Sequence, residues 1–129
     1  SFDNLKNWIT DSLTYLSESR HILASQTTAV STVKTYIESH LSEELDRDTL
    51  ASMVYLNADY LSHLFKKDTG SSLINYIIDR RIARSKELLL KGEMNIRDIA
   101  ITCGFQNISY FSRQFKKSTG MTPRQFRKQ

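Results

Sequence analysis

Two segments of the sequence carry polar and basic side chains at matching positions. Residues 57–70 read NADYLSHLFKKDTG and residues 107–120 read NISYFSRQFKKSTG, with eight identities at an offset of 50 residues. We call them the first copy and the second copy. Each holds a serine, then a histidine or arginine, then a Lys-Lys pair. Lysine and arginine bind phosphates, and serine, histidine and arginine can hydrogen-bond base edges. Together they could bind a polyanion and distinguish one base sequence from another.

The candidate base-contacting residues lie on the outward side of each copy, near its start. Leu61, Leu64 and Phe65 have the spacing of a buried helical stripe, which leaves other positions facing outward. We predict base contacts from Asp59, Ser62 and His63 in the first copy and from Ile108, Ser109, Ser112 and Arg113 in the second. Arg113 is the strongest candidate, because a guanidinium can bind guanine O6 and N7 together. Two roles remain open for Asp59. Its carboxylate could accept a hydrogen bond from cytosine N4, or it could stabilise the N-terminus of its own helix.

Phosphate contacts are predicted from the lysine pairs, from the asparagine that opens each copy and from one arginine near the C-terminus. These residues are Asn57, Lys66, Lys67, Asn107, Lys116, Lys117 and Arg124. Such contacts position a protein on DNA without specifying a sequence. The same side chains could instead form an ordinary solvated surface, but the recurrence of the lysine pair favours a binding role.

Charge is unevenly distributed along the chain. The 129 residues carry a formal net charge of +4. Residues 77–129 hold 12 basic and 4 acidic residues, whereas residues 30–76 hold 4 and 7. A basic half suits a polyanionic partner. Because the first copy lies in the acidic part, we expect its contact with DNA to be weaker and less strictly sequence-specific.

Catalytic and metal-binding chemistry has little support in the sequence. It contains no phosphate loop, nucleophile elbow or catalytic carboxylate pair, and its three histidines lack partners at zinc spacing. Cys103 aligns with Val54 of the first half, which favours core packing. We therefore predict no enzyme activity, no cofactor and no metal. The lone cysteine, and the lack of a signal peptide or of an apolar run of roughly 18 residues, indicate a cytoplasmic protein.

The elements expected to hold these residues are all helices. Hydrophobic spacing and capping residues predict helices at residues 3–24, at Val30–His40, after Asp46, from Asn57 to Gly70, from Ser72 to about Leu90, after Asn95, from Asn107 to Gly120, and from Thr122 through Phe126. The polar stretch 24–28 is a predicted linker. In the long helix the predicted apolar side includes Leu73, Ile74 and Ile77. No stretch has the alternation of a β-strand, so the predicted fold class is all-α.

Each copy continues upstream as a second, shorter helix, at an offset of 49 residues. Two helices separated by a tight turn form a helix-turn-helix, and the small Ala51 and Ala100 let the paired helices approach. Gly104 permits a positive φ in the second turn, but Tyr55 occupies that place in the first. Either the first turn has another shape or Tyr55 is strained. The later helix of each pair can enter a major groove.

These features resemble a known family. The chain from about Val30 to Arg127 is similar to the DNA-binding domain of AraC/XylS-type bacterial transcription regulators. The similarity rests on Arg81-Ile82, Ala83 and Leu88-Leu89, followed by IRDIAITCGFQNISYFSRQFKKSTGMTPRQFR. It implies seven helices in two helix-turn-helix subdomains, with two recognition helices entering successive major grooves on one face of DNA. The family's base-contacting positions match the seven residues named above.

The resemblance also implies an organisation for the chain. We expect a connector helix and linker at 1–29, a first helix-turn-helix subdomain at 30–71, a linking helix at 72–91 and a second subdomain at 92–129. The output domains of two-component response regulators are most similar, so a receiver domain is expected upstream; a cupin-like ligand sensor is the alternative.

Several partners are consistent with this organisation. The apolar face of residues 3–24, which includes Trp8, should pack against this chain, against the upstream domain, or against a second copy of itself in a homodimer. RNA polymerase is a further candidate partner. The alternative function is a helical protein–protein interaction module that binds an acidic partner through its basic half.

Overall fold

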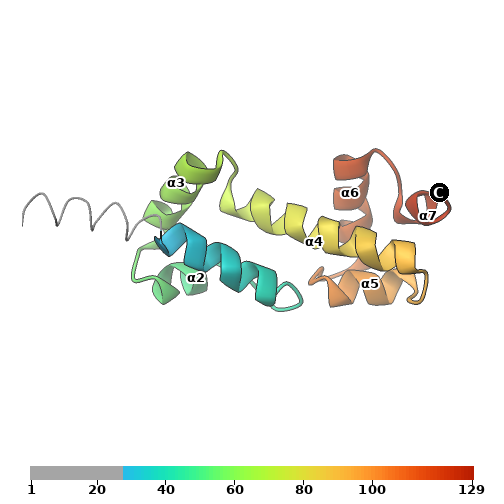
Figure 1. Ribbon diagram of the computed structural model, residues 1–129, viewed down its shortest axis with the longest axis horizontal. Coiled ribbons are helices and arrows are strands. Elements are labelled where there is room, and N and C mark those ends of the chain that lie inside the picture. The colour runs from blue at the N-terminus through green and yellow to red at the C-terminus, as the bar shows by residue number, and fades with distance from the viewer. Residues whose placement is uncertain (1–27) are drawn as a thin grey trace, which may run out of the picture.

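The computed structural model describes residues 28–129, and in this part of the chain every regular element is a helix. Residues 28–39 are helical, and α2 (Arg47–Met53), α3 (Ala58–Thr69), α4 (Leu73–Lys91), α5 (Ile96–Thr102), α6 (Ile108–Thr119) and α7 (Pro123–Arg127) follow (Figure 1). The predicted all-α class is confirmed. The predicted helix at 3–24 and the linker up to residue 27 lie outside the described residues.

The long helix α4 joins two lobes, each with its own core (Figure 1). The first lobe consists of the helix at residues 28–39, α2 and α3, and the second consists of α5, α6 and α7. From α4, Leu73 and Ile77 are buried in the first core, whereas Ile82, Leu88 and Leu89 are buried in the second. Because α4 contributes to both cores, it links the two lobes mechanically.

Helix boundaries follow from local capping. The side chains of six residues in extended conformation accept a backbone N–H three residues on: Asp46, Asn57, Ser72, Asn95, Asn107 and Thr122. This satisfies one of the donors that every helix start leaves free. Five of these caps were predicted. The prediction for the long helix was shifted by one residue, since Ser72 caps it and Leu73 begins it.

Three further details correct the sequence-based expectations. Ile74, predicted on the apolar side of the long helix, is 58% exposed. Leu73 and Ile77 already face the first core, and Ile74 is turned away from Leu73 by about 100°. Thr28 is helical instead of part of a linker, and His40 lies just beyond the helix that it was expected to end.

The two helix-turn-helix turns have the same shape. The amide of Leu56 donates to the carbonyl of Ala51 at 3.0 Å, and the amide of Phe105 donates to the carbonyl of Ala100 at 2.9 Å. Gly104 has φ +92°, and Tyr55 has φ +60°, a left-handed conformation that is costly for a tyrosine. Of the two alternatives for Tyr55, the structure supports the strained residue.

Candidate nucleic-acid interface

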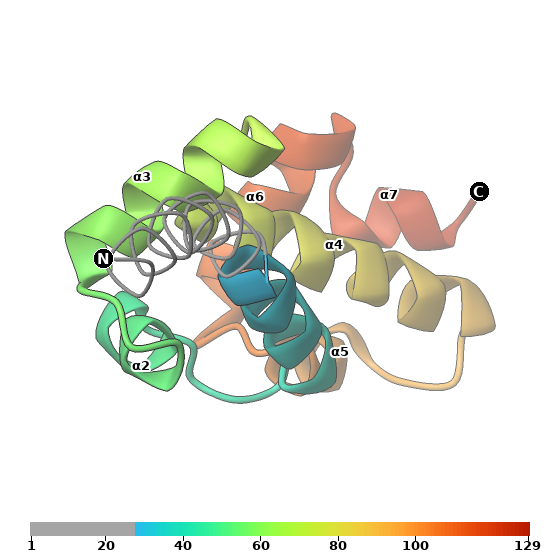
Figure 2. The same ribbon diagram turned by 60° about the vertical axis from the view of Figure 1, so that its left-hand side comes forward.

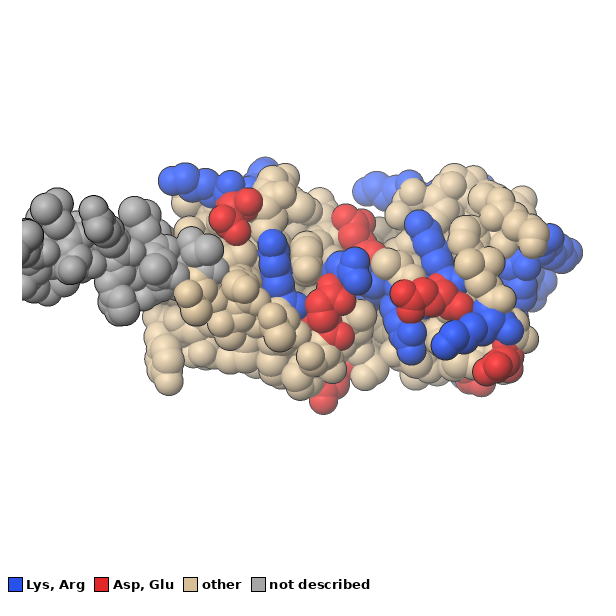
Figure 3. Space-filling view, viewed as in Figure 1, with Lys and Arg blue, Asp and Glu red and all other residues tan. Residues whose placement is uncertain are grey.

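Helices α3 and α6 lie on one side of α4, and α2 and α5 lie on the other (Figures 1 and 2). Lys and Arg side chains lie at the upper edge of both lobes, where α3 and α6 are, and the second lobe carries further ones over its front and its far end (Figure 3). The two helices that hold the candidate contacts therefore point the same way. Both helices can therefore contact the same face of a partner.

Buried aromatic and aliphatic side chains fix the rotational phase of these helices. Leu61 and Phe65 of α3, and Phe111 and Phe115 of α6, are fully buried. Of the predicted base-contacting residues, five are exposed, and Ser62 and Ser112 are half-buried. The exposed residues are Asp59, His63, Ile108, Ser109 and Arg113. The phase argument made from sequence thus matches the observed burial of both helices, except that Leu64, the third residue of the predicted stripe, is only half-buried.

In the first copy the structure shows a residue that sequence reasoning missed. Arg47 of α2 lies 3.5 Å from the carboxylate of Asp59 and donates a hydrogen bond to Ser62 Oγ at 3.3 Å. Asp59 therefore faces a cation from the neighbouring helix, a role that neither of its two predicted readings included. At an offset of 49 residues, Ile96 occupies the place of Arg47 in the second half. The sequence therefore did carry a signal for Arg47: a charged residue in the first half stands where the second half has an apolar one.

In the second copy the candidate residues line a groove. The groove, of about 590 Å³, is lined by Ile96, Ile108, Ser109, Ser112, Arg113, Thr122, Pro123 and Arg124. The guanidinium carbon of Arg113 lies 6.0 Å from the centre of the Tyr110 ring, close enough for a cation–π contact. Arg124, which α7 contributes, joins four predicted base-contacting residues in one surface, although it is distant from most of them in sequence.

The predicted phosphate-binding residues occupy both ends of the two helices. The asparagines Asn57 and Asn107 cap the N-termini, and each Oδ1 accepts an amide hydrogen at 2.7 Å. The pairs Lys66-Lys67 and Lys116-Lys117 are exposed in the last turns. The asparagines therefore lie at the same ends of α3 and α6 as the first base-contacting candidates, and the lysine pairs lie at the opposite ends.

Two arginines of α4 fix the first lobe against the second. The Arg81 guanidinium donates to the carbonyls of Leu41 at 3.2 Å and Glu43 at 2.8 Å. Burial lowers the pKa of Arg81. Arg80 pairs with Glu38, and the hydrogen bond that its guanidinium donates to that carboxylate raises the pKa of Arg80. These contacts join α4 to the end of the helix at residues 28–39 and to the loop that follows it.

Comparison with known proteins agrees with this geometry. A family model described as a helix-turn-helix domain, of the AraC type, matches residues 50–129. The chain belongs to the AraC family. The AraC-type domain is the DNA-binding part of bacterial transcription regulators. The prediction made from the repeated motif is confirmed, and so is the predicted architecture of two helix-turn-helix units.

Relatives of this AraC-type domain are found among both sequences and structures. The uncharacterized HTH-type transcriptional regulator YobQ of Bacillus subtilis is 44% identical over 92 residues, which are 71% of this chain and 38% of YobQ. The C-terminal domain of AraT, a response regulator from Geobacillus stearothermophilus, superimposes with a TM-score of 0.75 at 34% identity and covers 78% of this chain and 84% of that one. The DNA-binding domain of AdpA, solved in complex with a target DNA, has a TM-score of 0.74 at 25% identity, with 77% and 89% covered.

The AraC-type chain spans well under half of YobQ, so the remainder of such a regulator lies outside the matched region. Within residues 28–129, no group of three or more His, Cys, Asp or Glu side chains is arranged to hold a metal ion. Among the helices of that region, none combines the length and the apolar character needed to cross a membrane.

Proposed function

We propose that this AraC-type domain recognises a specific duplex DNA site by placing α3 and α6 in successive major grooves. The supporting observation is the shared orientation of the two helices on one side of α4 (Figures 1 and 2). In this proposal the base contacts come from Asp59, Ser62, His63, Ile108, Ser109, Ser112 and Arg113. Phosphate contacts come from Asn57, Lys66, Lys67, Asn107, Lys116, Lys117 and Arg124.

The two helices would read different base sequences. The copies share scaffold residues such as Phe65 and Phe115 but differ at the base-facing pair His63 and Arg113. The second lobe is the more basic one (Figure 3). An asymmetric site therefore fits this chain, with the second copy forming the tighter contact.

We also propose that the domain is the output part of a longer cytoplasmic regulator. The similarity to the C-terminal domain of a response regulator supports a receiver domain upstream, and a ligand sensor is the second candidate. In such a protein, RNA polymerase and a second regulator subunit are the expected protein partners. The subdivision proposed for the chain is 1–29, 30–71, 72–91 and 92–129.

Selection of bound fragments from a pool of random duplexes tests the proposal. We expect an enriched site with two recognised patches about 10–10.5 base pairs apart. Affinity for the selected duplex and for a scrambled duplex is then measured over a range of salt concentrations. Equal affinity for both duplexes would favour the second candidate function, a helical module that binds an acidic protein through the basic second lobe.

A pair of variants separates base contacts from phosphate contacts at the same helix. Arg113→Ala should cost about 1–3 kcal/mol on the selected site and relax one base position. Lys117→Ala should weaken binding to all duplexes alike and reduce the salt slope by about one unit. An unchanged sequence preference in Arg113→Ala would contradict the base-contacting role of that residue.

A further inference from the structure

An open groove runs along the outer side of the helix at residues 28–39. It has a volume of about 580 Å³, and its lining includes Thr28, Thr32, Thr35, Tyr36 and Met53 of α2. The lining contains no lysine, arginine, aspartate or glutamate. Its lining runs from Thr28, the first described residue, to His40, just beyond the end of that helix.

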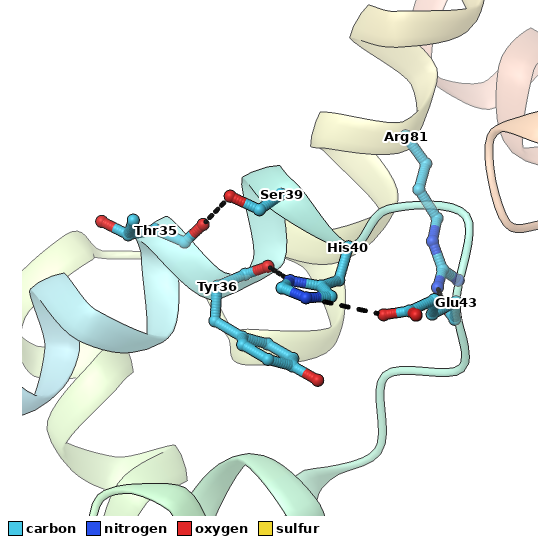
Figure 4. A network of polar contacts seen from close by, with 6 residues as sticks. All are labelled: Thr35, Tyr36, Ser39, His40, Glu43 and Arg81. Carbon is cyan, nitrogen blue, oxygen red and sulfur yellow. Dashed lines mark hydrogen bonds and ion pairs between the residues drawn. The ribbon is translucent and has the colours of Figure 1, made fainter.

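One wall of the groove is held in place by local contacts (Figure 4). The rings of Tyr36 and His40 stack with their centres 3.9 Å apart. His40 Nδ1 hydrogen-bonds the carbonyl of Tyr36 at 2.8 Å, and Ser39 Oγ donates to the carbonyl of Thr35 at 3.1 Å. The wall is therefore formed before any partner arrives, so little side-chain entropy is lost when the groove is filled.

The internal repeat gives this groove a counterpart in the second lobe. Val30, Val33 and Ile37 are buried with the same spacing as Ile82, Ser85 and Leu89 of α4, at an offset of 52 residues. By this alignment, three groove residues correspond to three residues of α4. The pairs are Thr28 with Arg80, Thr32 with Arg84, and Thr35 with Glu87. Met53 and Thr102 likewise correspond, because they are the last residues of α2 and α5.

In the second lobe this counterpart already has an occupant. Arg80, Arg84, Glu87 and Thr102 line one surface together with Glu38, Ser39, Leu41 and Ser42 of the first lobe. The ion pair between Arg80 and Glu38 fixes that contact. Helix α4, which precedes the second helix-turn-helix unit, thus holds the end of the helix at residues 28–39 and the loop that follows that helix. The equivalent seat on the first lobe is the groove, which begins at Thr28, the first described residue.

We propose that residues 3–24 dock in the groove of the first lobe. Two observations in the described region support this occupant over others. The chain enters the described region at Thr28, which itself lines the groove, so the preceding residues are tethered beside it. The seat in the second lobe binds charged Glu38 through Arg80, whereas the groove has threonine at the places of both arginines. The groove therefore lacks cations to seat a charged occupant, and the Tyr36 ring, the Met53 side chain and the threonine methyl groups favour an apolar one.

Residues 3–24 supply such an apolar surface. Leu5, Ile9, Leu13 and Leu16 recur at helical spacing, with Trp8 beside them. A tether of a few residues gives an effective concentration that a separate molecule rarely matches. The docked segment would attach the upstream part of the regulator rigidly to the first helix-turn-helix unit. The docking itself does not depend on DNA binding.

The only tryptophan of the chain, Trp8, reports the docking directly. Its emission maximum and its quenching by acrylamide are measured in the 129-residue chain, at a concentration where sedimentation shows a monomer. We expect blue-shifted emission that acrylamide quenches weakly. Thr32→Arg introduces an arginine into the groove, at the position that matches Arg84 of α4. This variant should shift the emission to that of a solvent-exposed indole and increase the quenching constant several-fold.

Ser118→Arg is the matched control, because it adds the same charge at an exposed position of α6, far from the groove. It should leave Trp8 unchanged, and circular dichroism should show that both variants keep their helices. Exposed Trp8 in the monomeric wild type would overturn the proposal. So would equal spectra for Thr32→Arg and the wild type. Shielding that appears only where the chain dimerises would assign Trp8 to a second copy of the chain instead.

Discussion

The guanidinium of Arg81 lies against the space that a side chain on Gly104 would occupy. A Cβ atom on Gly104 would be 2.8 Å from Arg81 Nε and 2.0 Å from the carbonyl oxygen of Leu41. The same guanidinium donates to that carbonyl. The turn of the second helix-turn-helix unit, the long helix and the loop of the first lobe therefore meet at one point. Here Gly104 meets two requirements, a positive φ and the absence of a side chain.

Gly104→Ala should be far more destabilising than Gly70→Ala. Both residues have positive φ, which costs an alanine about 1–2 kcal/mol. At Gly70 no atom lies within 4 Å of an added Cβ. At Gly104 the lobes must separate to admit it, and overpacking of this kind typically adds about 1–3 kcal/mol. Urea unfolding of the two variants measures the difference. Equal losses would show that the lobes do not press on this turn.

Tyr55→Gly should stabilise the domain. Tyr55 has φ +60° and is 96% exposed, so glycine would relieve strain and lose almost no packing. The relief of about 1–2 kcal/mol is partly offset by the larger unfolded-state entropy of glycine, about 0.5–1 kcal/mol. These ranges leave a net gain of up to about 1.5 kcal/mol, which urea unfolding measures. Tyr55→Ala is the control, since it removes the ring but keeps the strain and should leave stability nearly unchanged.

The sequence was sufficient to predict the features that depend on local rules. Caps such as Asn57 and Asn107 satisfy donors within their own helix, and the buried stripe of α6 follows from helical spacing. The clamp between Arg81 and Leu41 could not be predicted in this way, because it joins residues 40 positions apart. Its existence depends on how two lobes pack, which no local periodicity encodes.

The error at Ile74 and the omission of Arg47 have the same origin. Helical spacing makes Ile74 as good a core residue as Ile77, but only one flank of the start of α4 is covered by the first core. Likewise, nothing in the sequence near Arg47 indicates that it reaches across to Asp59 on the next helix. In both cases the neighbouring helix, and not the residue's own helix, decides the role.

Arg47 and Asp59 should be coupled in DNA binding if the proposed interface is correct. In Arg47→Ala the Asp59 carboxylate would face phosphates without its partner, so affinity should fall for every duplex. Asp59→Asn should restore part of this loss in the Arg47→Ala background and have a smaller effect alone. Fluorescence anisotropy on one duplex gives the double-mutant cycle. The exposed pair itself contributes about 0–1 kcal/mol to stability, so circular dichroism should show little change. Strictly additive affinities would contradict the coupling.

Cys103 should make the stability of the domain decrease at high pH. Burial raises the pKa of its thiol from an ordinary 9.0 to about 11. Below pH 9 the thiol is protonated in both the folded and the unfolded chain, so its contribution to stability is fully present. Between pH 9 and about 11 the unfolded chain releases the proton more readily, which favours unfolding. At about 1.4 kcal/mol per pKa unit, the loss across this window is about 1–3 kcal/mol.

Cys103→Ala isolates this effect from the titration of lysine and tyrosine residues. The variant should be less stable than the wild type at pH 8, because alanine leaves a small cavity in the second core. The difference between the two proteins should then narrow as the pH rises to 11, since only the wild type loses the contribution of the buried thiol. Urea unfolding under reducing conditions at several pH values measures this difference. A constant difference would mean that the folded chain ionises Cys103 as easily as the unfolded chain does.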